Sequence, residues 1–232
     1  MGAFHPRIAD LPDDFAIFPL AGALLLPQGR LPLNIFEPRF LAMTEDALAA
    51  GRMIAMIQPD LSRPADAAGN PALFRVGCLG RLISFSETDD GRYLITLDGL
   101  IRFRLVEERP MHRGYRRVRG DFTPFAADLS PAAPLDAAPL DAAYDRAALL
   151  DALRAYFGHR GLEANWNSIG QIPDEALVLT LSMACPFDPL ERQALLEAHT
   201  PADRAETLLA LLRIGTHQPP TEDGDGRQIR AS

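Results

Sequence analysis

One stretch near the N-terminus, residues 17–41, constrains the fold more than any other part of the sequence. Two short apolar runs, residues 17–20 and 31–36, are each bounded by proline or glycine, a pattern typical of buried strands. The period then changes, because Pro38 suits the first turn of a helix and Gly51 suits a helix C-terminus. The stretch therefore predicts two buried strands that lead into one helix, and this helix packs back on the sheet.

The rest of the chain divides by hydrophobic period into a β-rich part and a helical part. Alternating apolar residues predict further strands, and the Asp-Asp-Gly sequence at 89–91 predicts a hairpin turn between two of them. These strands are expected at residues 52–58, 73–85, 93–105 and 115–125. Further along, the period is helical, and a stripe of apolar residues at 149–157 stops near Gly158 or Gly161. Further helix starts are expected at Pro173, Asp188 and Thr200, and the last helix is expected to end at Gly215.

These patterns predict an α+β protein in four segments. The segments are a β-rich subdomain at 12–125, a proline-bearing linker at 126–140, a helical subdomain at 141–215 and a disordered polar tail at 216–232. The loop at 59–71 is long for a compact domain, which indicates either mobility or a function.

The residue inventory excludes several kinds of enzyme. The sequence contains no lysine, since all 23 Lys and Arg residues are arginine, so neither a Walker A lysine, a Ser-Lys dyad nor a Schiff-base lysine can form. Its histidines and cysteines show no metal-ligand spacing, and the carboxylate pairs fall on adjacent residues whose side chains point apart on a strand. We therefore expect no catalytic residues, no cofactor site and no metal site.

Compartment and partners follow from composition. Neither a signal peptide nor an apolar run long enough to span a bilayer is visible in the 232 residues. The two cysteines, Cys78 and Cys185, have no partner pattern and are expected to be small buried side chains in a reducing environment. We expect a cytoplasmic protein with no membrane partner. The net charge of −8 argues against a general nucleic-acid binder.

The sequence also carries a family resemblance. Residues 18–20 (FPL), the Leu-Leu-Pro at 25–27 and the run LPLNIFEPRF at 31–40 resemble the opening of the Lon N-terminal domain. That domain is the substrate-binding region at the front of Lon proteases and in stand-alone bacterial proteins. Two shorter segments, residues 99–105 and 191–205, resemble later parts of the same domain in the same order.

The resemblance covers roughly residues 12–215 and implies a fold and a role. The fold would be a PUA-like β pseudo-barrel wrapped on one helix, followed by a C-terminal helical bundle. The role would be contact with polypeptide substrates, and the family supplies no catalytic residue in this region. A complete Lon protease also needs an ATPase and a Ser-Lys protease site, and a chain without lysine could supply neither. The expected partners are polypeptide clients or a protease system, while the client and the oligomeric state stay open.

The residues themselves indicate where a polypeptide would bind. Three successive leucines stand in a connection between two predicted strands, where a partly exposed apolar patch would mark an interaction surface. Neighbouring residues could extend a groove, and an open sheet edge could accept an extended peptide. The predicted polypeptide-binding residues are Leu24, Leu25, Leu26, Pro27, Leu31 and Phe36. The alternative is that these leucines are core, covered by the C-terminal helices.

A second hypothesis is a nucleic-acid-binding PUA-like module. It would use an arginine-rich face on adjoining strands, composed of Arg102, Arg104, Arg113, Arg116, Arg117 and Arg119. Only Tyr115 is interleaved with these arginines, whereas single-stranded nucleic acid usually stacks on several aromatic side chains. The competing interpretation is a solvated strand face that pairs with local acidic residues, so nucleic acid is the less favoured partner.

Overall fold

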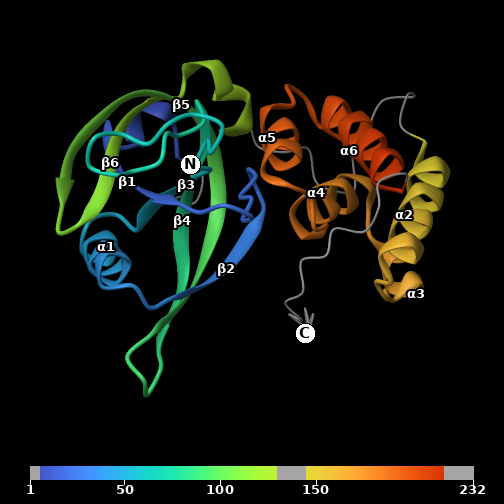
Figure 1. Cartoon of the computed structure of the whole chain (residues 1–232), viewed down its shortest axis with the longest axis horizontal. Helices are drawn as coiled ribbons and strands as arrows, with labels where there is room; N and C mark the ends of the chain where they lie inside the picture. The colour runs from blue at the N-terminus through green and yellow to red at the C-terminus, as the bar shows by residue number, and fades with distance from the viewer. Residues whose placement is uncertain (1–5, 130–144, 217–232) are drawn as a thin grey trace.

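The computed structural model describes residues 6–129 and 145–216 and shows a mixed α+β protein built of two adjoining parts (Figure 1). The strands are β1 (Asp14–Pro19), β2 (Arg30–Ile35), β3 (Met53–Ile57), β4 (Val76–Glu87), β5 (Tyr93–His112) and β6 (Tyr115–Asp121). The helices are α1 (Pro38–Ala49), α2 (Arg146–Arg160), α3 (Trp166–Gln171), α4 (Asp174–Ala184), α5 (Pro189–Glu197) and α6 (Pro201–Gly215). Two short 3-10 segments are η1 (Ile8–Asp10) and η2 (Thr123–Leu129).

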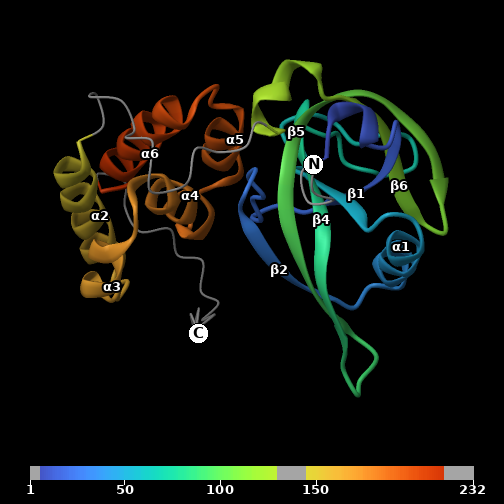
Figure 2. The same cartoon turned by 180° about the vertical axis from the view of Figure 1, so that it is seen from behind.

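The strands form one sheet whose pairings close on themselves. The order is β2-β5-β4-β3-β1-β6, and β5 also pairs with β6. Because β5 is long enough to pair with β4 along one part and β6 along another, five strands make a ring. Strand β2 pairs with β5 outside this ring, and the hairpin between β4 and β5 projects beyond the rest of the molecule (Figures 1 and 2).

The interior of the ring is filled by apolar side chains that include three phenylalanines, and two glycines make room for one of these rings. The rings of Phe15 and Phe103 meet edge to face with centroids 4.9 Å apart, and Phe122 packs beside them. A Cβ on Gly77 or Gly120 would lie less than 3.0 Å from the Phe103 ring. Glycine at these two positions therefore allows a large aromatic side chain where the strands approach closely.

The helix predicted after the opening strands is confirmed. Helix α1 begins with Pro38 at its first turn, and the chain leaves its end through Gly51 at φ +83°. Its buried face includes Phe40 and Met43, and the Phe40 ring packs 4.1 Å, centroid to centroid, from that of Phe18 on β1. The predicted change of period thus marks the point where the chain turns from strand to helix.

In the helical part, local capping signals coincide with the observed ends. Asp188 and Thr200 each form a capping box at the start of α5 and α6, and α2 ends at Gly161 with φ +64°. These starts and this end agree with the predicted positions. Helix α3 was not predicted, because a single short helix of six residues shows too little periodicity.

Several predicted boundaries differ from the structure, among them the end of β5, which lies at His112 instead of residue 105. The final strand ends at Asp121 instead of continuing to residue 125, because the chain turns into η2. The first residues of the predicted linker, 126–129, belong to η2, where Asp128 pairs with Arg102. The rest of that linker and residues 217–232 of the predicted tail lie outside the described residues, so the subdomain boundaries stay a prediction.

Candidate functional site

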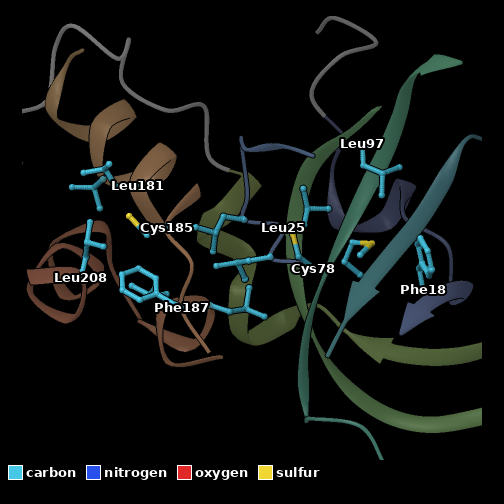
Figure 3. Close-up of a cluster of buried hydrophobic side chains, with 14 of the residues drawn as sticks. Phe18, Leu25, Cys78, Leu97, Leu181, Cys185, Phe187 and Leu208 are labelled. Carbon is cyan, nitrogen blue, oxygen red and sulfur yellow. The ribbon is translucent and has the colours of Figure 1, made fainter. Parts of the chain in front are cut away.

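The three leucines of the predicted patch are buried, and the expectation of an exposed patch is wrong for them. The exposed fractions are 2% for Leu24, 1% for Leu25 and 0% for Leu26. Figure 3 shows Leu25 in the middle of one apolar cluster, with Cys78 on its sheet side and Cys185 on its helix side. The helical part covers this connection, so the leucines join the two parts instead of facing solvent.

The other three predicted residues are accessible but lie apart. Pro27 and Leu31 are half-buried near the start of β2. Phe36 is 61% exposed beyond the other end of that strand, where the guanidinium of Arg92 lies 6.0 Å from its ring centroid. The structure therefore separates Phe36 from Pro27 and Leu31, which lie where the β part meets the helices.

An apolar hollow of about 420 Å³ lies between the start of β2 and α4, and we call it the β2–α4 groove. Its apolar wall includes Leu31 from the strand and Leu179 and Met183 from the helix. A Cβ on Gly29 would lie 2.3 Å from the Met183 sulfur, so a larger residue at this position would force the Met183 side chain to move. The full lining is Gln28, Gly29, Arg30, Leu31, Pro32, Leu179, Thr180, Met183 and Ala184.

The same groove borders a free strand edge. Strand β2 pairs only with β5 among the described residues. The Gly99 N–H donates to the Gly29 carbonyl, at 2.8 Å, on the β5 side. In an antiparallel ladder, the N–H and C=O groups of successive residues point to opposite sides of the strand. Since the Gly29 carbonyl points to β5, the backbone groups of Arg30, Pro32 and Asn34 point away from it. Proline lacks an N–H, which leaves this edge with three outward carbonyls and two outward N–H groups.

A second hollow of about 230 Å³ adjoins the groove, and we call it the Arg204 pocket. Gln28 and Leu179 line both hollows, so the two are neighbours around the same turn. The Arg204 pocket is lined by Pro27, Gln28, Arg102, Ala127, Asp128, Glu175, Leu179, His199, Thr200, Pro201 and Arg204. Both hollows therefore lie at the junction between the β part and the helices.

Arg102 holds this junction together. Its Nε and Nη2 donate to the two carboxylate oxygens of Asp128 at 2.9 and 2.8 Å. Its Nη1 donates to the carbonyls of Leu196 and Ala198 at the end of α5. One side chain of β5 thus binds η2 and the C-terminus of a helix, where a cation is favourable.

The arginines of the nucleic-acid hypothesis do not form one exposed basic face. Arg102 and Arg116 are buried, and the Nη2 of Arg116 lies 2.7 Å from Glu108. Arg113 and Arg119 pair with acidic side chains of α1 and β5. The remaining members of the set are Arg104 and Arg117. The expectation of a shared arginine face is therefore wrong, because cross-strand and cross-element carboxylates pair with most of it.

A third hollow, of about 290 Å³, lies between α1 and the strands β1 and β6. At its edge, Asp46 accepts hydrogen bonds from the Tyr115 hydroxyl at 2.9 Å and from Arg113 at 2.7 Å. Burial alone would raise the pKa of Asp46, but the two hydrogen bonds, together with the charges of Arg113 and His112, outweigh it and lower the pKa from its ordinary value. The arrangement is that of a structural ion pair between α1 and the sheet.

Other reactive groups are buried or dispersed in the described part of the chain. Burial raises the pKa of both thiols, that of Cys185 to about 12, so Cys78 and Cys185 stay protonated at neutral pH. Across residues 6–129 and 145–216, no three His, Cys, Asp or Glu side chains gather into a group that could hold a metal ion. Over the same ranges, none of the helices combines the length and the apolar character needed to cross a membrane.

The chain matches a known protein family over most of its length. A model of the ATP-dependent protease La (LON) substrate-binding domain matches residues 15–213. The chain belongs to this family. The match includes both β2 and α4, the two elements that form the β2–α4 groove.

Proteins with similar sequences include several Lon proteases. "Lon protease 2" of Myxococcus xanthus is 28% identical over 98 residues, which cover 42% of this chain and 12% of that protein. "Lon protease 1" of Herpetosiphon aurantiacus is 27% identical over 122 residues, which cover 50% of this chain and 15% of that protein. The chain thus spans only a small share of the length of these relatives.

Solved structures share the fold. A Lon N-terminal domain protein from Xanthomonas campestris has a TM-score of 0.55 at 21% identity and covers 85% of this chain and 97% of that one. The N-terminal domain of a Mycobacterium avium complex Lon protease has a TM-score of 0.57 at 13% identity and covers 86% and 97%. These similarities establish the arrangement of β part and helices as that of Lon N-terminal domains.

The sequence did not predict the helical side of the candidate site. Leu179 and Met183 were hidden in a helix with apolar residues on several faces. Arg204 was noted only as part of the family resemblance, since a lone arginine in a helix carries no signal of burial. The one usable signal was Gly29, a residue without a side chain that lies against Met183 at the junction.

Proposed function

We propose that this protein is a non-catalytic binding module for exposed apolar or unfolded segments of polypeptides. The observation that carries the proposal is the apolar β2–α4 groove beside the free edge of β2, in a member of the LON substrate-binding domain family. We further propose that the module acts in the cytoplasm, alongside a protease system and without ATPase or protease chemistry of its own. Its β part would be a PUA-like pseudo-barrel and its helices a C-terminal bundle.

Binding would combine backbone and side-chain contacts. An extended client chain can add to the β2 edge through the outward backbone groups of Arg30, Pro32 and Asn34. Alternate client side chains would then enter the groove against Leu179 and Met183. Burial of a leucine-sized side chain contributes about 1.5–3 kcal/mol, much of which offsets the lost freedom of an unfolded client. The expected binding is therefore weak and tolerant of sequence, as a binder of varied clients requires.

The test measures retention of an unfolded protein on the immobilised chain. A reduced, carboxymethylated model protein should be retained, and its folded form should pass through. Met183→Glu and Thr180→Glu, which place a charge on the groove wall, should each lower retention about tenfold. Met111→Glu is the matched control, because Met111 is exposed on β5 and does not line the groove.

Two outcomes would contradict the proposal. One is retention of the unfolded protein no greater than that of its folded form. The other is unchanged retention by both groove variants when their circular dichroism shows a native fold. Thr180 is exposed, so its variant tests the groove without disturbing the core.

A further inference from the structure

Arg204 is a buried cation with unused hydrogen-bond donors. The residue is only 9% exposed, and its Nε donates to the Leu195 carbonyl at 3.0 Å. Among the residues that the structure describes, its Nη1 and Nη2 have no hydrogen-bond or ion-pair partner. The side chain lines the Arg204 pocket, so these outer nitrogens are the groups available to a ligand there.

The other buried arginine of this pocket is already satisfied. Arg102 donates to Asp128 and to carbonyls at the end of α5, and these contacts occupy its whole guanidinium. Asp128 directs both carboxylate oxygens to Arg102 and makes no ion pair with Arg204. The pocket therefore contains one directly bonded ion pair and, beside it, the Arg204 guanidinium, whose Nη1 and Nη2 contact no carboxylate directly.

The surroundings of Arg204 favour an anion beside its guanidinium. Burial, together with repulsion from Arg102, lowers the pKa of Arg204 to about 10, which still leaves it charged at neutral pH. An anion placed against the Nη atoms of this largely buried guanidinium would offset part of the cost of its burial. The N-terminus of the fifteen-residue helix α6, at Thr200 and Pro201, lines the same pocket, and there the Asp203 carboxylate already accepts from the Thr200 N–H in a capping box.

The pocket limits which anion fits. The carboxylates of Asp128 and Glu175 also line it, so a doubly charged phosphate would be repelled more strongly than a singly charged carboxylate. Planar carboxylates match the fork of a guanidinium with two parallel hydrogen bonds. The pocket shares Gln28 and Leu179 with the neighbouring β2–α4 groove, so one ligand that passes these two side chains could place its anion in the pocket and apolar groups in the groove.

We propose that the Arg204 pocket binds the C-terminal carboxylate of an extended polypeptide, whose preceding apolar residues lie along β2 in the β2–α4 groove. This inference rests on the proposed function and narrows its client class to segments that end a chain. The carboxylate accepts from Nη1 and Nη2 of Arg204, and no covalent step is involved.

The test compares peptides that differ only at the C-terminus. Fluorescence anisotropy would follow the peptide Gly-Ser-Gly-Val-Leu-Val-Leu, labelled with fluorescein at its N-terminus, as the free acid and as the amide. The wild-type protein should bind the acid about tenfold more tightly, because a charge-assisted hydrogen bond is lost in the amide. In Arg204→Gln this preference should disappear, and in the control Arg63→Gln, an exposed arginine outside both hollows, it should persist.

Each outcome separates the two proposals. Equal binding of acid and amide by the wild-type protein overturns the role of Arg204 and leaves the groove intact as a polypeptide site. Absence of binding by either peptide, together with no retention of the unfolded protein, overturns the proposed function as well. An amidated peptide with an internal glutamate that binds as tightly as the free acid would show that the site reads any carboxylate, which overturns the preference for chain ends. The comparison within the wild-type protein needs no variant, so a folding defect in Arg204→Gln does not affect it.

Discussion

Replacement of Asp128 by asparagine would test whether the junction between β part and helices depends on one buried ion pair. The side chains of Arg102 and Asp128 are 5% and 10% exposed, and two hydrogen bonds of 2.9 and 2.8 Å join them. The Arg102 backbone N–H also donates to the same carboxylate at 3.0 Å. Asparagine keeps the shape of the side chain but removes its charge, so the Arg102 guanidinium remains buried without a counter-charge.

The expected loss of stability follows from this geometry. Removing one partner of a buried ion pair destabilises a protein by roughly 3–5 kcal/mol, because a buried charge is left uncompensated. Arg102 keeps its carbonyl partners at the end of α5 and asparagine can still accept one hydrogen bond, so we expect the lower end, about 3 kcal/mol. For a chain of this size, that corresponds to a fall in melting temperature of about 6–12 °C.

Urea and thermal unfolding of Asp128→Asn and a matched control would measure this. The control is Asp151→Asn, whose ion pair with Arg154 spans 2.9 Å but is exposed, with side chains 76% and 54% accessible. Exposed pairs contribute little, so the control should change stability by less than about 0.5 kcal/mol. If the two variants lose similar stability, the reasoning that Asp128 compensates a buried charge at the junction is wrong.

Two further predictions concern backbone space and acid stability. Gly99→Ala should abolish or strongly weaken folding, because its Cβ would lie 1.9 Å from a backbone carbonyl oxygen. Gly158→Ala has open space around it in α2 and should stabilise the protein by roughly 0.5–1 kcal/mol. Thermal melts of both variants would measure these effects, and a Gly99→Ala protein as stable as the wild type would contradict the packing. The lowered pKa of Asp46 contributes stability above the ordinary pKa of 3.8 that is lost as the pH falls through the lower folded value. Asp46→Asn keeps one carbonyl oxygen, which can accept from Tyr115 or from Arg113, and does not titrate in this range. It should therefore lose less stability than the wild type on acidification through that range, and identical acid limbs in urea titrations would refute this.

Much of the order of elements could be predicted, because helix starts and turns are encoded by neighbouring residues. Asp188 and Thr200 cap helices by bonding backbone groups three residues ahead, and Gly161 ends a helix through its own φ. Such contacts depend on no distant part of the chain. The short helix α3 escaped prediction because it has too few turns to show a period.

The candidate site was only partly predictable. Leu31 and Pro27 were identified from the apolar stretch around them, and both line the hollows at the junction. The helix side chains Leu179 and Met183, which face Leu31 across the groove, showed no separate signal. A groove formed by two elements far apart in sequence depends on how these elements dock, and periodicity within each element does not contain that information.

By itself, the sequence determined the α+β class, the positions of most strands and helices, and the family of the chain, since these follow from local periodicity, caps and an unusual run of residues. Tertiary structure alone decided which of these residues face solvent. It buried Leu24, Leu25 and Leu26 under the helices, paired Arg102 with Asp128, and left Arg204 facing a pocket. The physical reason is that burial and charge pairing are set by the surface that a distant segment places over a side chain, and the side chain's neighbours in sequence do not specify that surface.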